Sequence, residues 1–66
     1  MVVVYQGAEV ETDSASVAAF LAERSVDPAK AIVEHAGEVY APGSDLSAVA
    51  LVPGAALDVF RLTAGG

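Results

Sequence analysis

The chain has 66 residues, with nine acids against three bases, a net charge of −6 and 55% hydrophobic residues. Nucleic-acid binding needs a basic surface that neutralises phosphates, so three bases exclude that class, and anionic membranes are disfavoured for the same reason. No apolar run reaches the roughly 20 residues that a membrane-spanning helix needs. Because the start lacks the pattern of an export signal and the chain has no cysteine, we expect a cytoplasmic protein.

A single domain of this length buries only about 60% of the surface that its unfolded chain exposes, so its stability is marginal. Disulfides are excluded by the absence of cysteine, and the one histidine, His35, cannot build a metal site alone. We therefore expect either a tight apolar core or an apolar surface that serves a partner.

The start of the chain predicts a β-hairpin. Residues 1–6, written MVVVYQ, are rich in β-branched side chains, and residues 8–12 alternate small or apolar residues with charged ones. Gly7 lies between the two segments and accepts a positive φ without steric cost, which suits a turn.

The next segment predicts a helix that runs through about residue 25. Ser14 and Ser16 both carry a hydroxyl that accepts from the free N–H groups of a first turn, so either is a candidate cap. Pro28 prevents the helix from continuing, because the residue before a proline avoids the helical region. The apolar stripe at helical spacing consists of Val17, Phe20 and Leu21.

The second half of the chain predicts short strands separated by turns. Residues 30–35 and 38–40 form a strand pair around a glycine-containing turn, and residues 57–62 form the last strand. Residues 45–49 could form one helical turn. Residues 63–66 have too little side chain to pack, so we expect a mobile tail.

The order β-β-α-β-β-β predicts an α+β domain over residues 1–62, followed by the tail at 63–66. A single helix must lay its apolar stripe on one face of a sheet. The valine-rich first strand is expected to be buried on both sides and therefore central and not an edge strand, with the last strand parallel beside it. That arrangement, a mixed sheet of four to five strands packed on one main helix, is the β-grasp or ubiquitin-like fold.

A docking surface is predicted on the outer face of the sheet. If Asp58 faces water, the period of two turns Phe60 and Leu62 outward as well. The third strand presents Ile32 outward by the same alternation, and exposed apolar patches often mark partner sites. The alternative is that Phe60 or Leu62 closes the core. Simple alternation directs Arg61 inward.

The other polar and aromatic residues receive structural interpretations. His35 is interpreted as a turn residue, and Tyr5 and Tyr40 as packing residues. No pairing of a nucleophile with a base is evident, which argues against an enzyme. A solvated acidic face that favours basic partners is expected from Glu9, Glu11, Asp13, Glu34 and Glu38.

The whole chain resembles the sulfur-carrier branch of the ubiquitin-like proteins, and within it the carriers of thiamine biosynthesis. The resemblance is carried by MVVVYQG at the start, SVAAFLAE at the helix, IVEHAGEVYAPG in the middle and PGAALDVFRLTAGG at the close. Its specific element is the final Gly65-Gly66. Two turns depart from the usual pattern, since the family has Asn-Gly in place of Ala36-Gly37 and Gly-Asp before the last strand.

This resemblance implies a carrier protein and not an enzyme. Gly66 would carry the reactive group, because an ATP-using, ubiquitin-activating-type enzyme adenylates the terminal carboxylate and sulfur then converts it to a thiocarboxylate. Gly65 and Ala64 would form the slim tail that enters a partner. The implied partners are this adenylating enzyme, thiazole synthase and a sulfur donor such as a cysteine desulfurase. No cofactor is bound, since the partner enzyme uses the ATP.

Two alternatives stay open. The first is sulfur donation to molybdopterin or another metabolite, although the small subunit of molybdopterin synthase usually has extra helical structure for which residues 41–52 leave little room. The second is a ubiquitin-like protein modifier or a plain interaction domain.

Overall fold

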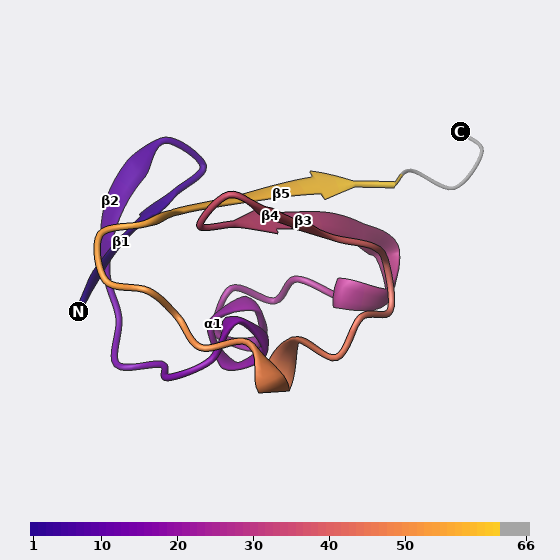
Figure 1. The fold of residues 1–66 in the computed structure, drawn as a ribbon, viewed down its shortest axis with the longest axis horizontal. Coiled ribbons are helices and arrows are strands. Elements are labelled where there is room, and N and C mark those ends of the chain that lie inside the picture. The colour runs from indigo at the N-terminus through magenta and orange to yellow at the C-terminus, as the bar shows by residue number, and fades with distance from the viewer. Residues whose placement is uncertain (63–66) are drawn as a thin grey trace.

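The computed structural model describes residues 1–62 and contains a five-stranded sheet with one α-helix across one face (Figure 1). The strands are β1 (Val2–Tyr5), β2 (Ala8–Glu11), β3 (Ala31–His35), β4 (Glu38–Tyr40) and β5 (Ala56–Arg61). Helix α1 spans Val17–Glu23, and the short 3-10 helices η1 and η2 span Pro28–Lys30 and Leu46–Ala48. No helix in this described part of the chain is long and apolar enough to cross a membrane.

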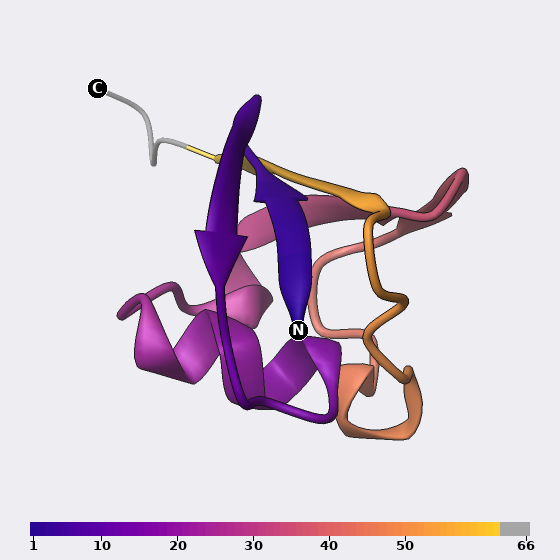
Figure 2. The same cartoon turned by 90° about the vertical axis from the view of Figure 1, so that its left-hand side faces the viewer.

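The strand order β2-β1-β5-β3-β4 is a mixed sheet. β1 and β5 run parallel, with Val4 opposite Ala56, whereas all other neighbouring strands run antiparallel. Figure 2 shows the sheet from its side, with α1 lying below the strands. The predicted α+β class, the single main helix and the parallel pairing of the first and last strands are therefore confirmed.

The first strand lies inside the sheet, as predicted, because β1 is flanked by β2 and β5, although the middle strand of the five is β5. The prediction that it is buried on both sides was wrong. Val3 is fully buried, but Val2 is 38% exposed and Val4 is only partly buried. Because helix α1 covers one face of the sheet, the other face stays open to water. The run of valines therefore reflects their preference for a pleated backbone and does not report burial on both sides.

Ser16 is the residue that caps the helix. Its backbone is extended, with φ −123° and ψ 160°, and its hydroxyl accepts from the Ala19 N–H at 3.1 Å. The helix ends at Glu23, earlier than predicted, because Arg24 closes it as the C-cap and Ser25 adopts a left-handed φ of 58°.

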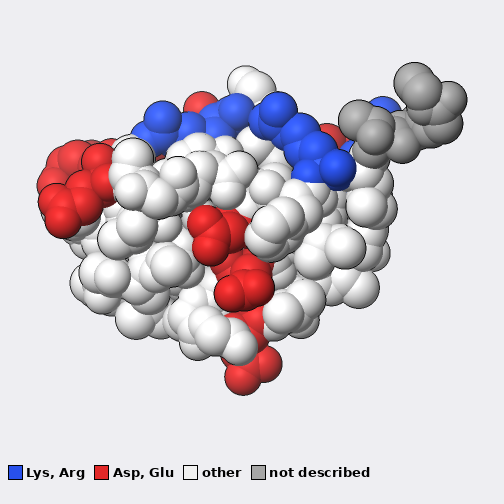
Figure 3. Space-filling view, turned by 90° about the horizontal axis from the view of Figure 1, so that it is seen from above, with Lys and Arg blue, Asp and Glu red and all other residues white. Residues whose placement is uncertain are grey.

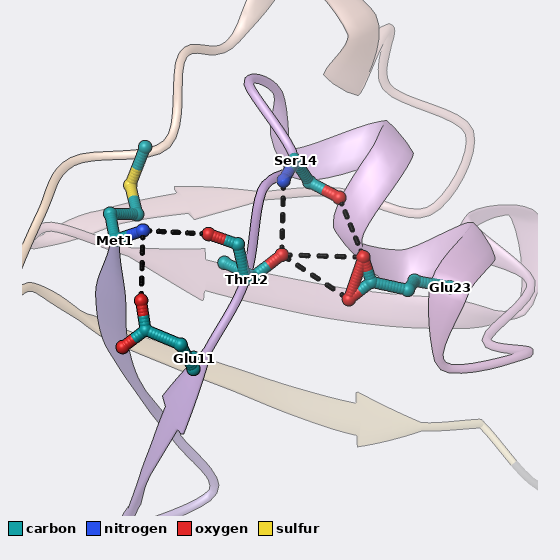
Figure 4. A network of polar contacts seen from close by, with 5 residues as sticks. All are labelled: Met1, Glu11, Thr12, Ser14 and Glu23. Atoms are coloured by element: carbon teal, nitrogen blue, oxygen red, sulfur yellow. Dashed lines mark hydrogen bonds and ion pairs between the residues drawn. The ribbon is translucent and has the colours of Figure 1, made fainter.

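Ser14 has a different role, in a polar network that ties the helix to the hairpin (Figure 4). Its hydroxyl donates to the Glu23 carboxylate at 2.9 Å, and the Thr12 hydroxyl donates to the same carboxylate at 3.2 Å. Next to it, the Met1 amino group donates to the Thr12 carbonyl at 2.7 Å and pairs with Glu11. The end of α1 is thus bound to the segment that follows β2.

The core lies between α1 and the inner face of the sheet, which is the face that the helix covers. The predicted stripe of the helix is buried, and the rings of Tyr5 and Phe20 meet edge to face, with 5.2 Å between their centroids. Tyr5 and Tyr40 are partly buried against the core, as predicted. The sheet and loops complete the core with Val3, Val26, Ala31, Val33, Leu46, Leu51, Leu57 and Val59.

The interpretation of His35 as a turn residue was wrong. It is the last residue of β3, only 2% exposed, and its ring lies on the inner face. Nε2 accepts from the Val52 N–H at 3.0 Å, so this nitrogen carries no proton, and Nδ1 donates to the Ala56 carbonyl at 3.0 Å. The imidazole therefore holds the segment that leads into β5 against the end of β3.

Replacing His35 with phenylalanine keeps a ring at this site and removes both hydrogen bonds. The Val52 N–H then loses its partner, whereas the Ala56 carbonyl keeps the bond that it accepts from the Ala36 N–H at 3.2 Å. An unpaired buried polar group costs about 1–3 kcal/mol. We expect the free energy of unfolding in urea to fall by about that amount. Amide exchange at Val52 should accelerate as well, and unchanged exchange there would show that water replaces the imidazole.

Candidate functional site

The candidate site is the outer face of the sheet where β5 ends. Figure 1 shows β5 running along the sheet toward the end at which the described chain stops. The predicted tail residues Ala64, Gly65 and Gly66 lie outside the described residues. What the structure describes is therefore the base from which the tail starts and the surface beside it.

The three residues predicted to dock a partner come together on this outer face. Phe60 lies directly opposite Ile32, and the Leu62 N–H continues the ladder by donating to the Lys30 carbonyl at 2.9 Å. Phe60 is 54% exposed and Leu62 is 51% exposed, while Ile32 is partly buried. The alternative that Phe60 or Leu62 closes the core is wrong. We call Ile32, Phe60 and Leu62 the outer patch.

The orientation of the outer patch is fixed by the residues between its members. Leu57 and Val59 are buried in the core, and Val59 lies opposite the buried Val33. A shift of β5 by one residue would expose this inner set to water and bury Asp58 and Phe60. The core therefore determines which side of β5 faces solvent.

Arg61 departs from simple alternation, because the structure leaves it exposed although its partner Ala31 is buried. A long side chain at the end of a sheet can lay its stem along apolar neighbours while its charge stays in water.

Figure 3 shows the outer face, with acidic side chains near its centre and basic side chains along its upper edge.

Gln6 holds β5 from the other side, and sequence reasoning missed it. β1 ends at Tyr5, and Gln6 opens the turn with a φ of 50°. Its side-chain Nε2 donates to the Val59 carbonyl at 3.1 Å, and its Oε1 accepts from the Val59 N–H at 3.0 Å. The amide thus takes the place of a peptide unit and extends the β1–β5 pairing. A primary amide next to the turn was the one signal in the sequence.

Comparison with known proteins gives one clear match. No family model matches the chain, and no curated protein matches it. A solved structure that matches is the thiamine biosynthesis protein (ThiS) from Geobacter metallireducens. The two chains are 26% identical, each is covered over 100% of its length, and the TM-score is 0.77. The β-grasp fold and the resemblance to ThiS-like carriers that the sequence predicted are thereby confirmed.

Replacing Gln6 with methionine tests whether its amide holds β5. Methionine has a similar unbranched shape but cannot pair with both backbone groups of Val59. A typical hydrogen bond contributes about 1 kcal/mol, so we expect the Val59 amide to exchange roughly five- to tenfold faster. The matched control is Glu9→Gln, which lies on the same hairpin and should leave that exchange rate unchanged. Equal rates in both variants would contradict the assignment.

Proposed function

We propose that this chain is a sulfur carrier of thiamine biosynthesis, with Gly66 as the residue whose carboxylate is activated. The observation that carries the proposal is the match to a thiamine biosynthesis protein over the full length of both chains. The final Gly65-Gly66 supports it independently, because two residues without side chains allow a narrow path into a partner.

The proposed chemistry overcomes the low reactivity of a carboxylate. An oxygen of the Gly66 carboxylate attacks the α-phosphorus of ATP on the adenylating enzyme, and pyrophosphate leaves. Hydrosulfide then attacks the carbonyl carbon. In a second route a persulfide makes this attack, and a thiol afterwards reduces the acyl disulfide that forms. The bond to AMP breaks, AMP leaves, and the thiocarboxylate that remains donates its sulfur to thiazole synthase. The carrier supplies the acyl group and the surface that positions it, and the partners supply the catalytic groups.

The described residues support this role through the base of the tail. β5 is paired with β3 on one side and with β1 and Gln6 on the other, so the residues before the tail are held firmly. Four extended residues after Leu62 span roughly 13 Å, which is enough to reach from the sheet into an active site. The outer patch lies beside the start of this segment and is the proposed docking surface.

The direct test is to incubate the protein with ATP, inorganic sulfide and a ubiquitin-activating-type adenylating enzyme, and then to measure its intact mass. We expect one oxygen to be replaced by sulfur. Deleting Gly66 should abolish this exchange and leave the unfolding midpoint unchanged, because the deleted residue lies beyond β5.

Other outcomes would contradict the proposal or redirect it. An unchanged mass, or conjugates with lysine side chains, would contradict a sulfur carrier and favour a modifier or an interaction domain. Rescue of a strain deficient in the molybdenum cofactor, without rescue of a thiamine-requiring strain, would assign the sulfur to the other pathway.

Replacing Phe60 with alanine separates docking from stability. Its ring is 54% exposed, so the free energy of unfolding should change by less than about 1 kcal/mol. Affinity for the adenylating enzyme, measured by titration calorimetry, should fall about tenfold or more, as at an aromatic anchor of an interface. The matched control is Val52→Ala, an exposed valine outside the outer patch, which should bind like the wild type. A large loss of stability without a separate loss of binding would place Phe60 in the core.

A further inference from the structure

The outer face carries two like charges in direct opposition. Glu34 on β3 lies opposite Asp58 on β5, two residues along the ladder from the pair Ile32 and Phe60. Both residues are half-buried. Like charges at directly opposed positions of an antiparallel pair destabilise a sheet. The domain therefore holds an unfavourable electrostatic contact beside the outer patch.

Nothing in the described part of the chain neutralises this pair. Among residues 1–62 the ion pair that forms joins the Met1 amino group to Glu11, at the other end of the sheet. Apolar side chains border the pair instead, since Val39 lies opposite Glu34 on β4 and is 66% exposed. A partner that covered this face without a cation would bury two carboxylates unpaired, which is strongly unfavourable.

We infer that the outer patch together with Glu34 and Asp58 docks the adenylating enzyme through an apolar surface that carries one basic side chain over the carboxylate pair. The identity of the partner rests on the function proposed above. Arginine suits this position best, because its planar guanidinium presents several donors and can bond both carboxylates at once.

The positions of the docking residues along β5 explain how the proposed contact would orient the chain on the enzyme. Asp58, Phe60 and Leu62 alternate on the outer face and lead directly to the start of the tail. A basic side chain fixed at Asp58 and an apolar contact at Phe60 set both the position and the direction of β5 on the enzyme. Charged contacts of this kind determine register and partner choice more than total affinity.

The experiment uses the double variant Glu34→Gln/Asp58→Asn. Removing the repulsion should leave the unfolding midpoint unchanged or raise it, whereas affinity for the adenylating enzyme should fall about tenfold or more. The dependence of the affinity on salt should also weaken, because two charges no longer take part. The matched control Glu9→Gln/Glu38→Gln makes the same change in net charge outside the pair, and it should keep the wild-type affinity.

A charge reversal gives a second, independent reading. Glu34→Lys creates an attractive pair with Asp58 inside the domain, so the unfolding midpoint should rise while binding to the enzyme is lost. A merely structural role for the pair would not move stability and affinity in opposite directions.

Formation of the thiocarboxylate by the wild type separates failure of this inference from failure of the proposed function. If the wild type is activated and both double variants bind equally well, the carboxylate pair has no role in docking and the inference is overturned. If the wild type binds the enzyme but gains no sulfur, the proposed function fails, and the affinities of the two double variants still decide the inference.

Discussion

The in-and-out alternation of β5 is the constraint on which the rest of this molecule depends. β5 is the central strand, and its inner residues Leu57 and Val59 are buried in the core. Because successive side chains of a strand point to opposite faces, burial of this pair fixes Phe60 and Leu62 on the outer face. The same residues that stabilise the domain therefore determine the surface and the direction that the chain presents before its tail.

Hydrogen bonds on both edges of β5 reinforce that constraint. On one edge the ladder with β3 continues to Leu62, whose N–H donates to the Lys30 carbonyl. On the other edge β1 is too short to reach Val59, and the Gln6 amide completes the pairing. His35 holds the segment before the strand through Val52 and Ala56. A strand supported from its entry to its end gives the residues that follow it a defined starting point.

Sequence patterns predicted those features that depend on neighbours along the chain. The stripe at Val17, Phe20 and Leu21 predicted the face of the helix, and the alternation at residues 57–62 predicted the exposure of Phe60. The patterns failed where the role of a residue is set by contacts with segments that are distant in the sequence. His35 is separated from Val52 and Ala56 by β4, η2 and the turns between them, so no local period reports their contact.

The role of Gln6 was missed, and the burial of β1 was wrongly predicted, for the same reason. Both depend on how distant parts of the chain are arranged around β5 and the sheet. A side chain that pairs with a backbone 53 positions away leaves no periodic trace in the sequence. The number of layers that cover a sheet is likewise a property of the whole fold. The pattern in β1 could report a preference for extended backbone, but it could not report that no helix among the described residues covers the second face of the sheet.

Glu23 and the pair Glu34 and Asp58 differ in how well the fold satisfies their carboxylates. The Glu23 carboxylate has hydrogen-bond partners within the domain, because the Thr12 and Ser14 hydroxyls both donate to it. Glu34 and Asp58 oppose each other with no cation paired to them within residues 1–62, next to exposed Phe60 and Val39. A small domain with marginal stability tolerates such an arrangement at the expense of its own folding. Local rules that hold across the rest of a structure are most often broken where a surface serves a partner. In this chain they are broken on the face that leads to the C-terminal segment, so the electrostatic and the apolar observations identify the same surface.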